Sequence, residues 1–278
     1  MFFRLEPHDY ARGESLFAPM HDHLAVRAVL AGKFLGEVYV DDAIHPRAGI
    51  VIVARRRFYL AGDAHNVQFN LALQQFFAET VYPQAIQAGK KLLGLYFEPS
   101  DWAMQMSVIL KNKNAIQPPR YHFLLKRLEH DWRDLLPSDF SIRLVDRALL
   151  ADMNIRGLDE LTQEMQSERA SVGDFLDQSF GVCLIHDNAV AGFCLSEYNV
   201  GDACEVGIET HHAFRKRGLA TAMASALIEH ALARGVKNIG WHCYASNLAS
   251  VATAQKIGFE KVRDYTIFQA WYDEPSRP

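Results

Sequence analysis

The chain has 278 residues, with 29 basic and 33 acidic side chains and a formal net charge of −4 when the histidines are neutral. This length suggests one or two domains, and we expect two. The lack of a positive global field argues against nucleic acid or an anionic membrane as a partner. No apolar run reaches the roughly 18 residues typical of a spanning helix, and no secretory pattern opens the sequence, so we expect a cytoplasmic protein.

The cysteines give a second indication of compartment. Cys183, Cys194, Cys204 and Cys243 all lie within apolar or strand-like runs, and they form no Cys-x-x-Cys pair. We therefore expect buried, reduced thiols. Phosphate-loop, dinucleotide-binding and nucleophile-elbow motifs are all absent from the sequence, and no histidine, cysteine or carboxylate group has the spacing of a metal site. We expect no bound metal.

The first half of the chain predicts an α/β domain over residues 1–134. The expected order is helix, strands, helix, strand, helix, strand, from the apolar periodicity of each segment. The segments are helix 19–32, strands 37–42, 48–55 and 57–62, helix 66–89, strand 91–97, helix 101–110 and strand 120–125.

Proline and polar residues over 135–140 predict a linker, which places a second domain at 141–278. Asp187 and Asn188 form a turn dipeptide between two strand-like runs and predict a hairpin. The expected elements of the second domain are strand 141–145, helices 148–156 and 161–170, strands 180–186, 190–198 and 205–210, helix 219–234, strand 239–244, helix 247–258 and strands 260–262 and 265–271.

A short basic turn follows the strand that begins at Glu205. Arg215, Lys216 and Arg217 supply three cations, and Gly218 and Ala220 leave the backbone accessible where the next helix begins. The first amides of a helix have no intrahelical partner, and the helix dipole is positive at the same end. This junction of strand, turn and helix therefore predicts a phosphate-binding site.

The pattern Arg215-x-x-Gly218-x-Ala220 resembles the pyrophosphate signature of the GCN5-related N-acetyltransferases. Asn247 at the start of a later helix, and Gly258 with Phe259 at its end, match a second hallmark of that family. The resemblance implies a fold of the α/β (α+β) class, with a mixed, mostly antiparallel central sheet flanked by helices. The first domain has the same order of elements, but its corresponding turn, residues 62–66, is acidic. It is either a degenerate copy that cannot hold CoA or an unrelated α/β domain.

The resemblance also implies acetyl-CoA as cosubstrate and names the segments that bind it. Backbone amides of the fourth strand would hold the thioester carbonyl, the basic turn would hold the pyrophosphate, and the later helix would flank the arm of the cosubstrate. The corresponding positions are Ile208, Glu209, Thr210, Arg215, Lys216, Arg217, Gly218, Leu219, Ala220, Thr221, Asn247 and Ser250.

Acetyl transfer to an amine requires a base. An alkyl ammonium of pKa about 10.4 costs roughly 4.6 kcal/mol to deprotonate at pH 7. Glu205 is the first candidate, because relatives often place a catalytic glutamate on this strand; a surface carboxylate is the alternative reading. Glu209 shares its face by period-two counting, Glu197 lies on the adjacent strand, and His242 is the imidazole option.

Protonation of the departing thiolate is less well specified. The family often has a tyrosine seven residues after the asparagine, but this chain has Ala254 there. Tyr244 and Ser250 are nearby hydroxyls that could replace it. A CoA thiol is acidic enough (pKa about 8.5, if it resembles cysteine) that a dedicated acid is dispensable.

The whole chain resembles the two-domain acetyltransferase group that includes zwittermicin A resistance proteins. Residues 38–42, 58–63 and 241–243 carry this likeness. It implies transfer of the acetyl group to a primary amine of a small molecule, with an amino-polyol antibiotic as one acceptor class, in a monomer or homodimer whose first domain shapes the acceptor pocket. The alternative is an inactive protein that binds CoA or sequesters a substrate.

Overall fold

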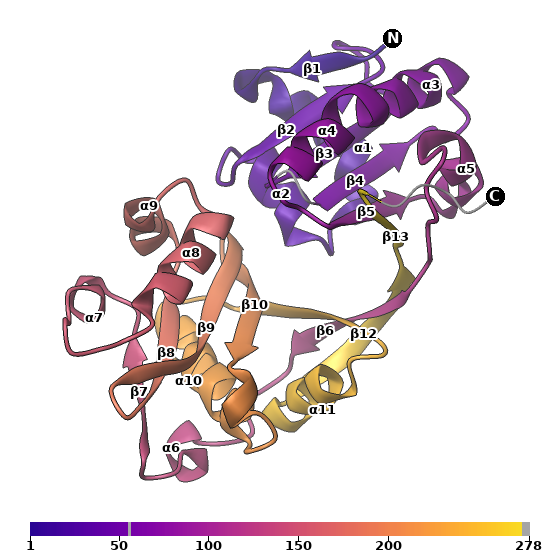
Figure 1. The fold of residues 1–278 in the computed structure, drawn as a ribbon. Coiled ribbons are helices and arrows are strands. Elements are labelled where there is room, and N and C mark those ends of the chain that lie inside the picture. Colours follow the sequence, from indigo (N-terminus) through magenta and orange to yellow (C-terminus); the bar gives the residue numbers. More distant parts are fainter. Residues whose placement is uncertain (55–56, 274–278) are drawn as a thin grey trace. The chain divides into compact units, whose positions relative to one another are not determined.

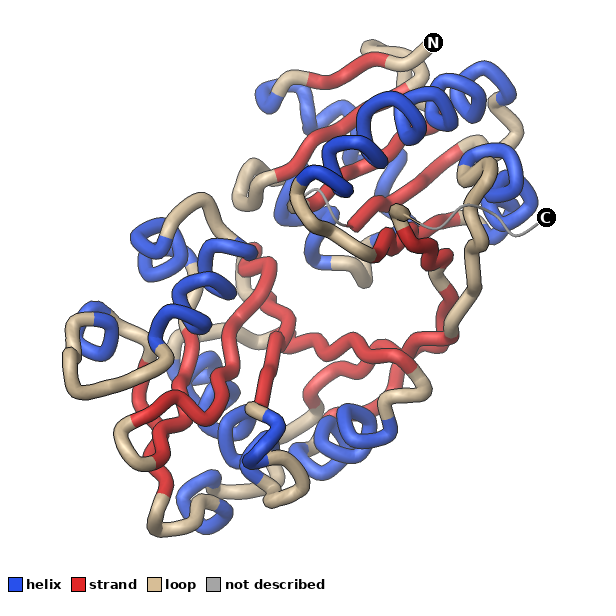
Figure 2. The backbone as a smooth tube through the Cα atoms, viewed as in Figure 1, coloured by secondary structure: helices blue, strands red, loops and turns tan. Residues whose placement is uncertain are grey.

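The computed structural model describes residues 1–54 and 57–273 and divides the chain into two compact units (Figure 1). Unit 1 comprises Met1–Pro119 together with the segment that starts at Thr266, and unit 2 comprises Arg120–Tyr265. Each unit contains one β-sheet with helices packed on it (Figure 2). Among the described residues, no helix combines the length and the apolar character that crossing a bilayer requires.

The sheet of unit 1 has the strand order β1-β2-β3-β4-β5-β13. Its strands are β1 (Phe3–Leu5), β2 (Gly36–Val40), β3 (Ala48–Val53), β4 (Arg57–Gly62), β5 (Leu92–Glu98) and β13 (Phe268–Trp271). All six residues of β3 are buried, which is why its sequence is a continuous apolar run rather than an alternating one. β4 and β5 are parallel, and the other neighbours are antiparallel.

The predicted helix over 66–89 is confirmed, with a π-helical turn in the middle. It consists of α3 (Val67–Phe76), the π-helix η3 (Phe77–Val81) and α4 (Tyr82–Gln87). The remaining helices are η1 (Pro7–Gly13), α1 (Glu14–Phe17), η2 (Ala18–Met20), α2 (Leu24–Leu30), η4 (Ser100–Gln105) and α5 (Met106–Ile109). Phe69, Phe77 and Trp102 are fully buried and join these helices to the sheet in one apolar core.

The sheet of unit 2 has the strand order β12-β6-β11-β10-β9-β8-β7. Its strands are β6 (Pro119–Leu125), β7 (Phe140–Leu144), β8 (Gly181–His186), β9 (Ala189–Val200), β10 (Ala203–Thr210), β11 (Asn238–Tyr244) and β12 (Phe259–Thr266). Its helices are α6 (Trp132–Leu135), α7 (Arg147–Leu150), α8 (Leu158–Glu168), α9 (Val172–Gln178), η5 (His212–Phe214), α10 (Leu219–Ala233) and α11 (Leu248–Ile257). The hairpin of β8 and β9 is confirmed, because Asp187 and Asn188 both have positive φ, as a tight two-residue turn requires.

The two units share a topology. In unit 1, β2, β3 and β4 are consecutive antiparallel strands, and α3 to α4 connect β4 to its parallel neighbour β5. In unit 2, β8, β9 and β10 are likewise antiparallel, and α10 connects β10 to its parallel neighbour β11. The first half of the chain therefore repeats the architecture of the second half.

The expected domain limits of 1–134 and 141–278 need correction. Strand β6 pairs with β11 in the sheet of unit 2, although the prediction places it in the first domain. Strand β13 pairs with β5 in the sheet of unit 1, although the prediction places it in the second. Residues 135–140 join α6 to β7 within unit 2 and do not separate the units. Apolar periodicity identifies a strand but does not specify the sheet edge with which it pairs.

The assignment of β13 to unit 1 can be tested at Ala270, which is 1% exposed within the unit 1 core. Replacing Ala270→Glu places an unpaired charge there, and we expect unit 1 to lose about 3 kcal/mol or more of stability. Hydrogen exchange should accelerate in the peptides of β5 and remain slow in those of β11. Val262→Glu on β12, where the side chain is 47% exposed, is the control. Faster exchange in β11 rather than β5 would contradict the assignment.

Candidate active site

The two central strands of unit 2 separate along their length. β10 pairs with β11 only from Ala203 to Glu205, whereas its pairing with β9 continues to Thr210. The amide of His211 donates to the Ala191 carbonyl at 3.0 Å, which sets the alternation of amide directions along β10. The amides of Ile208 and Thr210 therefore point toward the side that β11 has left. The predicted third amide, that of Glu209, is directed at β9 instead.

The basic turn leads directly into α10. Lys216 and Gly218 both have positive φ, 62° and 78°, which turns successive backbone amides toward one side. The first helical hydrogen bonds run from the amides of Thr221 and Ala222 to the Gly218 carbonyl, at 3.0 and 3.3 Å. The amides of the three residues before them therefore precede the helical ladder. A Cβ on Gly218 would meet no atom within 4 Å, so the backbone there is open to a ligand.

A cavity of about 610 Å³ lies between this turn, the open side of β10 and the start of α11. Its lining includes every predicted cofactor residue except Arg217. The lining residues are Ile208, Glu209, Thr210, Phe214, Arg215, Lys216, Gly218, Leu219, Ala220, Thr221, Trp241, Asn247, Ala249, Ser250 and Thr253. We call this cavity the CoA groove, after the cosubstrate that the sequence resemblance predicts there. Its size falls in the usual range for small-molecule sites.

Arg217 and Arg215 behave differently, although they are neighbours in the turn. The Arg217 guanidinium lies over the Phe140 ring at 4.9 Å and 3.7 Å from the Asp139 carboxylate, outside the lining of the CoA groove. The Arg215 side chain lines the groove and donates through Nε to the Thr210 carbonyl at 2.9 Å, which joins the basic turn to the end of β10.

The α11 side of the groove explains why the helix begins with asparagine. The Asn247 side chain accepts from the Ser250 amide at 3.1 Å as an N-cap, and Trp241 Nε1 donates to Ser250 Oγ at 3.0 Å. Ala254 is fully buried in the core, whereas Thr253 lines the groove. Sequence reasoning missed Phe214, Trp241, Ala249 and Thr253. Trp241 could have been found from the sequence, because strand alternation places its side chain on the helix-covered face of β11, next to the part of β10 that lines the groove.

Tyr244, one of the predicted hydroxyl donors, is not among the described residues that line the groove. Its ring lies under the Arg120 guanidinium at 4.3 Å, and it is two residues along β11 from His242. Strand alternation places Tyr244 and His242 on the sheet face opposite the Trp241 and Cys243 side chains, which pack with α10 and α11.

That opposite face carries the acidic residues. Glu205, Gly207 and Glu209 alternate along β10, and Glu197 lies directly across from Glu205 on β9. A Cβ at Gly207 would lie only 2.2 Å from Glu197 Oε1, so glycine is required for the Glu197 carboxylate to cover this part of the sheet. Oxygens of Glu164, Glu168 and Glu197 lie within 4.8 Å of one another.

A second, smaller cavity of about 120 Å³ opens on this face, and we call it the acidic cavity. It is lined by Glu164, Phe193, Leu195, Glu197, Gly207, Ile208 and Glu209. Ile208 and Glu209 line both this cavity and the CoA groove. This part of β10, beyond the point where β11 leaves it, is therefore a wall common to both cavities.

A cluster of ring side chains surrounds Glu205. His242 Nε2 lies 3.7 Å from Glu205 Oε1, an ion-pair distance, and the two side chains are only 9% and 12% exposed. His122 of β6 stacks on His242 with ring centroids 4.1 Å apart and planes inclined by 6°. Tyr265 Oη is 2.9 Å from His242 Nδ1 and accepts from Arg120 Nε at 2.9 Å. The sequence prediction missed His122 and Arg120 because it assigned β6 to the other domain.

The four cysteines are free and buried, as predicted. Burial raises the pKa of the Cys183 and Cys204 thiols to about 12, and it raises those of Cys194 and Cys243 as well. A neutral, enclosed thiol is a poor nucleophile. This chemistry favours direct transfer of an acyl group to an acceptor over a route through an acyl-cysteine.

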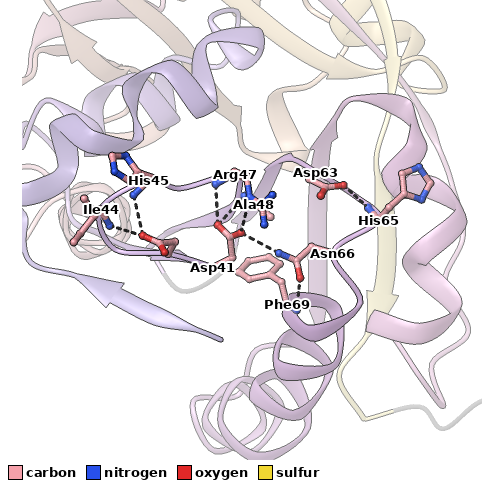
Figure 3. Close-up of polar contacts among 10 residues, drawn as sticks. Asp41, Ile44, His45, Arg47, Ala48, Asp63, His65, Asn66 and Phe69 are labelled. Carbon is pink, nitrogen blue, oxygen red and sulfur yellow. Dashed lines mark hydrogen bonds and ion pairs between the residues drawn. The ribbon is translucent and has the colours of Figure 1, made fainter.

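The corresponding turn of unit 1, after β4, is closed by its own side chains (Figure 3). Asn66 caps α3 by accepting from the Phe69 amide at 3.0 Å and donates to the Asp41 carboxylate at 2.9 Å. Asp63 accepts from the His65 amide at 2.9 Å. The turn after β4 thus carries a carboxylate, Asp63, and contacts a second one, Asp41, whereas the turn in unit 2 carries three cations. In addition, β4 and β5 stay paired from Arg57 to Ala61, so these strands do not separate.

The comparisons with known proteins agree with this geometry. The family described as GNAT acetyltransferase matches residues 14–268. An uncharacterized N-acetyltransferase of Bacillus subtilis, YdfB, is 24% identical over 260 residues, covering 93% of this chain and 95% of its own length.

Solved structures extend the likeness to the whole fold. A GCN5-related N-acetyltransferase-like protein from Streptococcus suis superposes with a TM-score of 0.69 at 25% identity, covering 95% of this chain and 98% of that one. A tandem GNAT protein from the clavulanic acid biosynthesis pathway shares the fold at 12% identity, with a TM-score of 0.57 and 98% coverage of both chains. The predicted family and two-domain architecture are confirmed, and the chain belongs to the GNAT acetyltransferase family and is an acyltransferase.

Proposed function

We propose that the chain transfers the acetyl group of acetyl-CoA to a primary amine of a small cationic molecule. The single observation that supports this most strongly is that two unlike cavities share one strand as a wall. The CoA groove has free amides and a basic turn, the acidic cavity has carboxylates, and Ile208 and Glu209 line both. A thioester and an ammonium group that enter from opposite faces would meet at β10.

The CoA groove suits both the pyrophosphate and the thioester of acetyl-CoA. The turn with Arg215, Lys216 and Gly218 would hold the pyrophosphate through backbone amides, the positive end of α10 and two cations. The amides of Ile208 and Thr210, directed away from β9, would donate to the thioester carbonyl as negative charge develops on its oxygen.

The acidic cavity suits a protonated amine. Glu164 and Glu197 line it, and the buried Glu168 carboxylate approaches both. Carboxylates this close repel one another, so a cation between them is favourable. The small volume, about 120 Å³, fits an aminomethyl or aminosugar end rather than a bulky group. Amino-polyols, aminosugars and diamines are acceptors with this chemistry.

We assign the role of base to Glu205, and Glu209, which lines both cavities, is the alternative. Glu205 is the last β10 residue paired with β11, on the same face as the acidic cavity and next to the buried His242 imidazole. It would take one proton from the ammonium. The free amine then attacks the thioester carbon, the C–N bond forms, and the C–S bond breaks to release CoA thiolate. Two hydroxyl groups that line the groove, those of Thr253 and Ser250, lie close in sequence to Ala254, where the family often has the tyrosine that protonates the thiolate.

The buried Ala254 favours one rival, a protein that binds CoA without transferring the acetyl group. A thiol-release assay with acetyl-CoA and a panel of amino-polyols, aminosugars and diamines separates the two functions. Amine-dependent thiol release supports the transferase. Acetyl-CoA binding without thiol release from any amine would establish the rival.

Gly218 tests the CoA groove, and Gly235 offers a matched control at the other end of α10. Both glycines have positive φ, and neither would have an atom within 4 Å of an added Cβ. Phenylalanine at either site strains the backbone by roughly 1–2 kcal/mol. We expect Gly218→Phe to abolish acetyl-CoA binding by calorimetry and Gly235→Phe to leave it within about twofold of wild type. Equal binding by both variants would refute the pyrophosphate assignment.

Glu205→Gln should remove the base while keeping the shape of the side chain. We expect kcat to fall by about a hundredfold or more, with the Kd for acetyl-CoA unchanged, because general-base assistance contributes at that scale. Glu260→Gln, on the exposed part of β12, is the control. If kcat falls in Glu209→Gln but not in Glu205→Gln, Glu209 is the general base instead.

Glu197→Gln tests the acidic cavity. A charge-assisted contact to the ammonium would be lost, so we expect the KM for the amine to rise about tenfold, which corresponds to about 1.4 kcal/mol, while the KM for acetyl-CoA stays within about twofold. Steady-state kinetics with each substrate varied in turn provides the measurement. A rise in the KM for acetyl-CoA alone would argue against an acceptor site in this cavity.

A further inference from the structure

We propose that His242 takes on the proton that Glu205 removes from the acceptor amine, and that Tyr265 and Arg120 hold the His242 ring in the orientation this transfer needs. His242 is thus a relay and positioning residue that acts through Glu205. This inference rests on the proposed function, because it requires a proton-releasing reaction at Glu205.

The stoichiometry of the reaction creates the need for a relay. An ammonium acceptor loses two protons on becoming an amide: one before it attacks the thioester and one as the tetrahedral intermediate collapses. The CoA thiolate can accept one of them. The other must leave the site in every turnover, and a carboxylate that is only 12% exposed cannot pass it freely to bulk water. His242 is no more exposed, at 9%, so it does not deliver the proton to bulk water directly; it holds the proton beside Glu205, which regenerates the base, until product release admits water or buffer to the pair.

The hydrogen bonds of the cluster suit that role. An arginine can only donate, so Tyr265 accepts from Arg120 Nε through one lone pair of its oxygen. The hydroxyl keeps its own proton and a second lone pair. It can therefore donate to a bare His242 Nδ1 or accept from a protonated one, across the same 2.9 Å distance. The His242 ring can gain or lose a proton at Nε2, which faces Glu205, without losing its partner at Nδ1.

His122 fixes the plane of the His242 ring. The two imidazoles stack almost parallel at 4.1 Å, and His122 is buried on β6 directly opposite His242 of β11. An imidazolium over a neutral aromatic ring is favourable, whereas two stacked imidazolium rings repel. The pair therefore accommodates one added proton, and the stack keeps His242 Nε2 directed at Glu205.

The surrounding charges are nearly balanced. Two carboxylates and two guanidinium groups lie on the strands around His242, together with three ring side chains. They are Glu197 of β9, Glu205 of β10, Tyr244 of β11, His122 and Arg120 of β6, and Tyr265 and Arg263 of β12. Glu205 is the one that approaches Nε2, so protonation of His242 forms an ion pair with it.

The test uses the full chain with His242→Gln, assayed by thiol release across pH 6 to 10. Without the imidazole, the proton on Glu205 must pass to hydroxide or buffer. We expect kcat at pH 7 to fall about tenfold or more and to recover as pH or buffer concentration rises, with the Kd for acetyl-CoA unchanged. Tyr265→Phe should shift the profile in the same direction by a smaller factor.

Tyr121→Phe, on the other face of the same sheet, is the matched control, because its ring packs against Phe123 and Lys261 away from this cluster. A wild-type chain without amine-dependent thiol release would overturn the proposed function and the relay together. If the wild type is active, two results would overturn the relay alone. His242→Gln could keep the wild-type kcat and pH profile. Alternatively, its kcat could fall equally at every pH and buffer concentration, as a purely structural role predicts.

Discussion

The structure of unit 2 depends on the separation of β10 from β11 after Glu205. Backbone amides in a sheet normally bond to a neighbouring strand, and an unpaired one is costly unless another partner satisfies it. The separation leaves the Ile208 and Thr210 amides unpaired with β11, on the part of β10 that lines both cavities. Pairing of β10 with β9 is retained throughout, so the opening forms without loss of the sheet. A rigid strand with free donors on one edge is suited to stabilising a developing oxyanion.

The two units show how one topology can either open or close this site. Both have three antiparallel strands, a helical connection and a parallel fifth strand. In unit 1 the parallel strands stay paired over nearly the whole of β4. Asp63 and Asn66 accept from the amides of His65 and Phe69, and Asp41 holds the Asn66 side chain in place. In unit 2 a basic turn with positive φ at Lys216 and Gly218 leaves its amides exposed. The side chains of one short turn thus distinguish the open site of unit 2 from the closed turn of unit 1.

The pairing of β6 and β13 with sheets other than the predicted ones has a consequence for the chemistry. Strand β6 follows the unit 1 elements in sequence but pairs with β11, and it brings Arg120 and His122 next to Glu205 and His242. Strand β13 completes the sheet of unit 1 in return. The residues that we propose handle the proton therefore come from both ends of the unit 2 sequence. An acetyltransferase domain taken as residues 141–278 would lack Arg120 and His122.

The sequence by itself determined most local elements and the family of the chain, and it predicted the turn for the acetyl donor. Period-two and helical patterns located most strands and helices, and the Asp187-Asn188 turn specified the hairpin. The spacing of Arg215, Gly218 and Ala220 predicted the turn that we propose holds CoA. Each of these signals depends on neighbouring residues alone. Only the tertiary structure decided the domain limits, the amide directions along β10, the acidic cavity and the cluster around Glu205. Those depend on which distant strands pair and in what register, and side-chain periodicity carries no information about the identity of a pairing partner.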